Sequence, residues 1–245
     1  MNTTDKKDVI HKAWLYKILS AVYADSFIAH NLYFKGGTCA SMLGYLDRFS
    51  VDIDLDFVGN AKDIPALREI LERIFSDLGL EIKDQSKNTI QYFLKYPNTA
   101  GERNTVAIDA VFPVPKANLY EPKRFIDIDR TIICQTKETM FGNKLVAVMD
   151  RLKKHGAIAG RDIYDVHHFF SHNFSFTEAV ILERTGKKTK DFFQELTVFI
   201  EKHITDTILI QDLSNLLSPE QFRDARKNLK KNTLIFLRTY LNTLD

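Results

Sequence analysis

The chain has 245 residues, of which 44% are hydrophobic and 27% charged, and its formal net charge is +2. These values are ordinary for a globular protein, and the length allows one large or two small domains. With so little net charge, any nucleic-acid partner must be bound by a local patch. Two cysteines exclude a disulfide scaffold, and no apolar run approaches the length of a membrane span. The N-terminus lacks an apolar signal core, so we expect a cytoplasmic protein.

The first half of the chain mixes helix and strand patterns. Apolar residues at helical spacing predict helices over residues 5–25, 38–46 and 64–78. Alternating or β-branched runs predict strands over residues 32–34, 51–57, 80–83, 89–96, 106–112 and 131–134. Pro65 suits the first turn of its helix and Gly79 the C-terminal cap.

From residue 137 the patterns are helical. Helices are predicted over residues 138–154 and 161–171, and three or four more fill residues 176–244. We place a soft domain boundary near residue 136. The predicted fold class is therefore α+β, with a mixed-sheet core over residues 1–136 and an α-helical bundle over residues 137–245.

The predicted strand 51–57 carries three acids. Asp52, Asp54 and Asp56 share one face because strand side chains alternate. Carboxylates this close repel one another unless a cation lies between them, and Mg²⁺ prefers oxygen ligands. The alternative is an edge strand with a solvated acidic face. Asp is disfavoured in strands, and upstream the run Gly36-Gly37-Thr38 offers backbone N–H groups and a hydroxyl to phosphate oxygens, so we prefer the metal hypothesis.

These motifs resemble a known family. Gly36-Gly37-Thr38 followed by Arg48-x-Ser50-x-Asp52-Ile53-Asp54-Leu55 is similar to the AbiEii toxins, nucleotidyltransferases of the DNA polymerase β-like superfamily. The resemblance continues at Lys144-Leu145-x-Ala147 and Arg161-Asp162-Ile163-Tyr164-Asp165, so it covers about residues 30–170. It implies a polymerase β-like core and a Mg²⁺-dependent enzyme that uses an NTP. It also implies the toxin of a toxin–antitoxin pair, whose antitoxin is a separate protein. Some relatives modify the 3′ end of tRNA.

The resemblance assigns roles to residues of the first half. Asp52 and Asp54 would bind Mg²⁺, with two metal ions as the common arrangement, and Gly36, Gly37 and Thr38 would hold the nucleotide. Asp109 is expected on a neighbouring strand, and two hypotheses for it are equally supported. It is either a third catalytic and metal-binding carboxylate or an ordinary solvent-facing residue. Asp56 either supports the ligands or is solvated. Arg48 and Ser50 either position the strand or contact the nucleotide.

Later residues complete the proposed site. Lys144 is expected to bind triphosphate oxygens as a point charge, although from its position alone it would be an ordinary solvated lysine. With the resemblance, Asp162 is the catalytic member of the two aspartates and Asp165 a structural partner. The alternative for both residues is helix capping and surface pairing. His167, His168 and His172 lack the pattern of a zinc site, so a packed or solvated helix face is expected.

Basic residues gather near the C-terminus. One helix face carries Arg223, Arg226, Lys227, Lys230 and Lys231. This stripe is either a solvated face or a contact for RNA phosphates. The leading hypothesis is an NTP-dependent nucleotidyltransferase toxin acting on tRNA. The alternatives are a protein or small-molecule acceptor, and a catalytically silent nucleotide-binding module, against which Asp52 and Asp54 argue.

Overall fold

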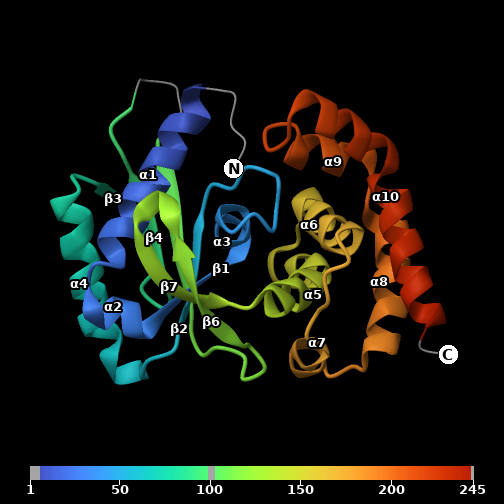
Figure 1. The fold of residues 1–245 in the computed structure, drawn as a ribbon, viewed down its shortest axis with the longest axis horizontal. Coiled ribbons are helices and arrows are strands. Elements are labelled where there is room, and N and C mark those ends of the chain that lie inside the picture. The colour runs from blue at the N-terminus through green and yellow to red at the C-terminus, as the bar shows by residue number, and fades with distance from the viewer. Residues whose placement is uncertain (1–5, 99–102, 244–245) are drawn as a thin grey trace. The chain divides into compact units, whose positions relative to one another are not determined.

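The computed structural model describes residues 6–98 and 103–243. The chain divides into two compact units (Figure 1). Unit 1 consists of residues 1–114 and 119–136, and unit 2 of residues 115–118 and 137–245.

Unit 1 is built on a mixed sheet. In the described residues the strands are β1 Leu32–Lys35, β2 Ile53–Phe57, β3 Glu81–Gln85, β4 Ile90–Lys95, β5 Thr105–Val111, β6 Tyr120–Phe125 and β7 Arg130–Gln135. They lie in the order β3-β4-β5-β2-β1-β7-β6. The pairs β2/β5 and β1/β7 are parallel and the others antiparallel. β2 and β1 are therefore central, which buries Ile53 and Leu55 on one face.

The helices of unit 1 differ from the expectation at two places. They are α1 Lys6–Val22, α2 Ser26–Asn31, α3 Gly36–Met42 and α4 Ile64–Asp77, with short 3₁₀ turns η1 Ala61–Asp63 and η2 Ile126–Ile128. The single helix expected over residues 5–25, whose first residue lies outside the described ranges, was wrong at its end. The carboxylate of Asp25 accepts the N–H groups of Phe27 and Ile28 and begins α2.

Three further corrections concern α3, β2 and β6. α3 begins at Gly36 and ends at Met42, earlier than the expected 38–46. β2 begins at Ile53, so Asp52 lies just before the strand and not in it. Strand β6 was not expected, because it contains Pro122 and three charged residues. It is an edge strand, where proline is tolerated.

Unit 2 is helical in all its described regular elements. They are α5 Lys137–His155, α6 Gly160–Ser171, α7 Glu178–Thr185, α8 Thr189–His203, α9 Asp206–Leu213 and α10 Pro219–Asn242. α10 packs against α6, α8 and α9. α6 begins at Gly160, which packs closely against α9. A Cβ at this position would lie 3.1 Å from the carbonyl oxygen of Ile208, so the close packing favours glycine. Within the described ranges, every helix is too short or too polar to span a bilayer.

Candidate active site

A row of charged side chains crosses three strands of unit 1. Asp54 in β2 is the Cα partner of Lys35 in β1 and of Asp109 in β5. Residues opposite each other in a sheet point to the same face, so the three side chains lie side by side. Burial raises the pKa of the Asp109 carboxyl, the negative charge of Asp54 raises it further, and Lys35 opposes both. We call Lys35, Asp54 and Asp109 the charged row.

Asp56 supports the charged row from the interior. It is fully buried, and its carboxylate accepts hydrogen bonds from Lys35 Nζ at 2.6 Å, Tyr120 Oη at 2.8 Å and Gln135 Nε2 at 2.6 Å. The solvated alternative for Asp56 is therefore wrong. Its three hydrogen-bond donors were not predicted from the sequence. Lys35 directly precedes the glycine pair, which is a usable signal, whereas Tyr120 and Gln135 lie in strands with no motif.

The glycine pair approaches Asp54 closely. Gly36 has φ +78°, and a Cβ there would lie 2.1 Å from Asp54 Oδ2, so any other residue would displace the carboxylate. A Cβ on Gly37 would lie 2.8 Å from Ser50 Oγ. These glycines bring the backbone at the start of α3 against the charged row.

Thr38, Arg48 and Ser50 are buried behind the glycine pair. The Thr38 hydroxyl lies 3.0 Å from Ser50 Oγ and also donates to the carbonyl oxygen of Asp52. Arg48 Nη1 donates to the carbonyl of Phe49 at 2.9 Å. Asp52 itself is half-buried. These contacts fasten the segment before β2 to α3, which favours the positioning role for Arg48 and Ser50.

The charged row offers a metal too few protein ligands for a closed cage. In the described part of the chain, no three or more His, Cys, Asp or Glu side chains form a metal-binding group. Mg²⁺ in nucleotide sites is commonly held by one or two carboxylates together with phosphate oxygens and water. Asp54 and Asp109 provide that set. The donors therefore fit a divalent ion that is bound together with a nucleotide.

In unit 2, two buried aspartates form ion pairs with two cations of α5. Lys144 Nζ lies 2.7 Å from Asp165 Oδ2, and Arg151 Nε lies 2.9 Å from Asp162 Oδ2. Both carboxylates are almost fully buried, so the alternative of surface pairing is wrong. Lys144 is only 17% exposed and is not an ordinary solvated lysine. The aspartate that contacts Lys144 is Asp165, which we had expected to be the structural member of the two, and Asp162 contacts Arg151 instead.

The three histidines of α6 and its C-terminal cap form no metal site with the described residues. The rings of His168 and His172 stack with centroids 4.1 Å apart, and His172 Nδ1 lies 2.8 Å from the carbonyl oxygen of His168. His167 packs against the ring of Phe236. The expected packed helix face is confirmed for His167.

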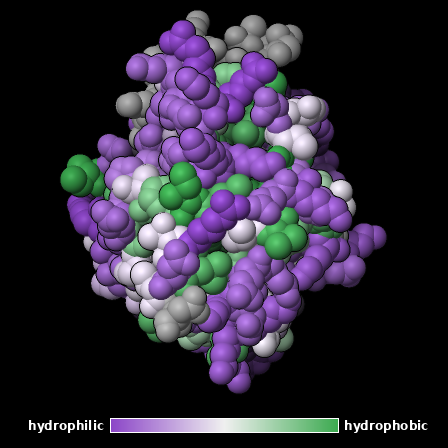
Figure 2. Space-filling model, turned by 90° about the vertical axis from the view of Figure 1, so that its right-hand side faces the viewer, coloured by the Kyte–Doolittle hydropathy of each residue, from purple (hydrophilic) through white to green (hydrophobic). Residues whose placement is uncertain are grey.

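The basic stripe of α10 contains residues of two kinds. Lys230 Nζ donates to the carbonyls of Glu201 and Ile204 at 2.8 Å, which caps the C-terminus of α8. Arg226 lies 4.0 Å from Asp206. The other members, Arg223, Lys227 and Lys231, are exposed. Figure 2 faces the side on which α8 and α10 lie in Figure 1, and there hydrophilic residues surround separate hydrophobic groups.

Comparison with known proteins decides the family. A family model described as "Nucleotidyl transferase AbiEii toxin, Type IV TA system" matches residues 17–239. The chain belongs to the AbiEii nucleotidyltransferase toxin family. The expected enzyme class and α+β fold are thereby confirmed, and the match extends well beyond the motifs at residues 30–170. A search of curated protein sequences found no match for this AbiEii protein.

Solved structures share the fold at low sequence identity. A Helicobacter pylori nucleotidyltransferase structure aligns with TM-score 0.60 and 18% identity, covering 98% of this chain and 99% of its own. JHP933 of Helicobacter pylori aligns with TM-score 0.54 and 18% identity, covering 99% and 98%. MenT4, a nucleotidyltransferase toxin of Mycobacterium tuberculosis, aligns with TM-score 0.56 and 16% identity, covering 95% and 84%. The AbiEii protein therefore has the fold of these proteins.

Proposed function

We propose that this AbiEii toxin is a Mg²⁺-dependent nucleotidyltransferase that transfers a nucleotide from an NTP to the 3′ end of tRNA. The observation that supports it most is the charged row packed against Gly36. Two adjacent carboxylates beside a glycine turn provide metal ligands and close backbone approach to phosphates at one place.

Asp54, Asp109 and Asp52 would hold the metal ions. When bound, the ions neutralise charge on the triphosphate and on the attacking oxygen. The Gly36 and Gly37 backbone admits the phosphates next to Asp54. Asp109, the Cα partner of Asp54 in the charged row, is also the candidate to accept the proton of the acceptor hydroxyl. A bond then forms from the acceptor oxygen to the α-phosphorus, the bond to the β-phosphate oxygen breaks, and pyrophosphate leaves.

Lys144 supplies a positive charge to the triphosphate in this proposal. The buried carboxylate of Asp165, 2.7 Å away, orients the ammonium group. We therefore assign to Asp165 the role first given to Asp162. Asp162 holds Arg151 in a second pair on the same two helices, which makes it a structural residue.

An RNA acceptor is supported by the exposed cations of α10. A protein or small-molecule acceptor would need a pocket beside the charged row and not a stripe of cations on a helix. The antitoxin implied by the family is a separate protein, and we assign it no contact with this chain.

Labelling by each of the four α-³²P NTPs in a mixture of tRNA and cellular protein tests the proposal. We expect label on tRNA, which periodate oxidation of the 3′ terminal ribose should prevent. Asp54→Ala should lower transfer at least about a hundredfold, and Lys144→Ala should raise the KM for NTP. Label on protein alone, or full activity of Asp54→Ala, would contradict the proposal.

A further inference from the structure

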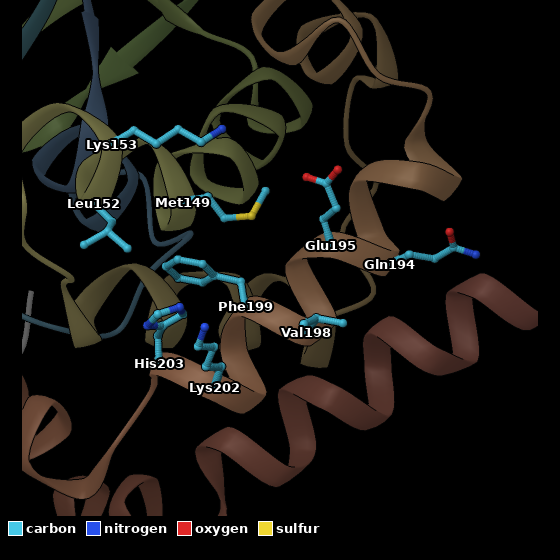
Figure 3. A pocket seen from close by; sticks show the side chains of 9 residues that line it. All are labelled: Met149, Leu152, Lys153, Gln194, Glu195, Val198, Phe199, Lys202 and His203. Atoms are coloured by element: carbon cyan, nitrogen blue, oxygen red, sulfur yellow. The ribbon is translucent and has the colours of Figure 1, made fainter.

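One cavity of unit 2 has no role in the proposed chemistry. It has a volume of about 590 Å³, within the range of small-ligand sites. It lies between the C-terminal half of α5 and α8 (Figure 3). Its lining residues are Met149, Leu152, Lys153, Gln194, Glu195, Val198, Phe199, Lys202 and His203.

The middle of the cavity is apolar and contains an aromatic ring. Met149 is nearly buried, whereas Val198 is 61% exposed. In Figure 3 the ring of Phe199 lies between the side chains of Met149 and His203. It also contacts the ring of His203, with centroids 4.8 Å apart. A flat apolar ligand would find an aromatic surface here.

The charges around this apolar floor are mostly positive. Lys153 comes from α5, whereas Lys202 comes from α8, and both are exposed. Glu195 is the acid of the lining, and it is already paired with Lys187. The cavity therefore favours a ligand with a flat apolar body and negative groups on either side.

A more basic cavity adjoins this one at the C-terminus of α8. Lys202 and His203 line the first cavity, while Ile204 and Thr205, the next residues of the chain, line the second. The second cavity measures about 460 Å³. Its cations are Arg226, Lys227, Lys230, Lys231 and Arg238. A nucleic-acid backbone whose phosphates contact α10 would thus lead to the aromatic cavity.

We propose that the cavity between α5 and α8 binds an unpaired base of the acceptor RNA. The base stacks on Phe199, and the flanking phosphates contact Lys153 and Lys202. Aromatic platforms between cations are how proteins hold single-stranded nucleic acid. This inference rests on the proposed RNA acceptor. An acidic amphipathic helix is the competing ligand, but the exposed cations Lys227 and Lys231 of the adjoining cavity lie along one helix face, which is better matched to a phosphate backbone.

The test uses the full-length protein and two fluorescent RNA hairpins, one blunt and one with a four-nucleotide single-stranded 3′ tail. We expect the tail to raise wild-type affinity about tenfold, the value of one stacked base. Phe199→Leu should lose this advantage and bind both hairpins alike. Phe199→Trp should keep it. Phe222→Leu, which removes a half-buried ring of α10 outside the cavity, is the matched control.

A 2-aminopurine base in the tail reports stacking directly. Its fluorescence should be quenched by wild type and by Phe199→Trp, and not by Phe199→Leu. Equal tail preference in wild type and Phe199→Leu would overturn the inference while leaving the proposed function intact. If neither hairpin binds, the result would instead contradict the proposal that the acceptor is RNA. Displacement of the tail by an acidic amphipathic helical peptide, without quenching, would assign the cavity to a protein partner.

Discussion

His11 is a buried titratable residue that contacts the segment before β2. Its Nε2 lies 2.9 Å from the carbonyl oxygen of Val51, and its Nδ1 lies 2.9 Å from the hydroxyl of Tyr96. Burial lowers its pKa from 6.5 to about 4, and the charge of Arg103 acts in the same direction, while the bond to Val51 opposes it. The neutral ring fastens α1 to the residue that precedes Asp52.

We predict that this histidine makes the protein acid-sensitive. Between pH 6.5 and 4 the unfolded chain binds a proton at residue 11 that the folded chain does not, so stability falls as the pH falls. From pH 7 to 4.5 the loss from this residue should be about 2 kcal/mol. Urea unfolding of wild type and His11→Gln at both pH values measures it. The exposed His30→Gln is the control, and equal pH dependence in wild type and His11→Gln would contradict the prediction.

Single residues show what the sequence can and cannot predict about the site. Asp54 was singled out because a type of residue disfavoured in strands recurs there at a fixed phase, whereas the sequence left the role of Asp109 open and only the strand pairing places it beside Asp54. The donors to Asp56 were missed because Tyr120 and Gln135 come from β6 and β7, far along the chain. Asp162 and Asp165 lie on one helical turn, and only the pairing of α5 with α6 decides which of them meets Lys144. Tertiary packing, not local pattern, carries that information.

At the scale of elements, strand β1 places the positive charge of Lys35 beside the carboxylates of Asp54 and Asp109. Lys35 is only 18% exposed, and Asp56 anchors it. Its charge also acts on Asp109. We propose that Lys35 serves as the resident counter-ion of Asp54 and Asp109 before metal binds. At an effective dielectric constant near 20, a charge at this range contributes about 1–3 kcal/mol.

Removing Lys35 should therefore make stability depend on divalent metal. Lys35→Met in an Asp56→Asn background, which avoids leaving Asp56 unpaired, should melt lower in EDTA than Asp56→Asn alone. Millimolar Mg²⁺ should restore part of the difference. Lys95→Met removes an exposed pair with Glu81 and should behave alike in both buffers. If the deficit of the Lys35 variant is the same with and without Mg²⁺, the counter-ion role is wrong.

The elements themselves were predictable to different degrees. The helices of unit 2 and strands β4 and β5 follow strong periodic patterns, and the structure confirms them. β6 was not predicted because an edge strand needs few hydrophobic residues. The separate helix α2 was not predicted because the N-capping residue Asp25 lies inside an apolar run. α3 begins at Gly36, two residues earlier than expected, and Gly36 itself has a left-handed φ of +78°.

For the whole molecule, a net charge of +2 conceals an uneven distribution. The charged row and its aspartates belong to unit 1, and the α10 stripe belongs to unit 2. Apart from Lys144 of α5, the residues to which we assign bond formation thus belong to a different unit from those to which we assign acceptor binding. This separation predicts that acceptor binding can be changed by mutation without a change in NTP binding.

Charge reversal on α10 tests that separation. Arg223, Lys227 and Lys231 are the residues to change to Glu, because Lys230 caps α8 and its loss would destabilise unit 2. The triple variant should bind tRNA more weakly, and the deficit should shrink as salt rises, because each lost phosphate contact lowers the salt slope by about one. NTP binding should be unchanged. Lys62, Lys83 and Lys87, exposed cations of unit 1, changed to Glu together, give a control of equal net charge. Parallel salt slopes for wild type and the α10 variant would mean that the stripe is a solvated face, and a slope reduced equally in the control would mean that net charge alone governs RNA binding.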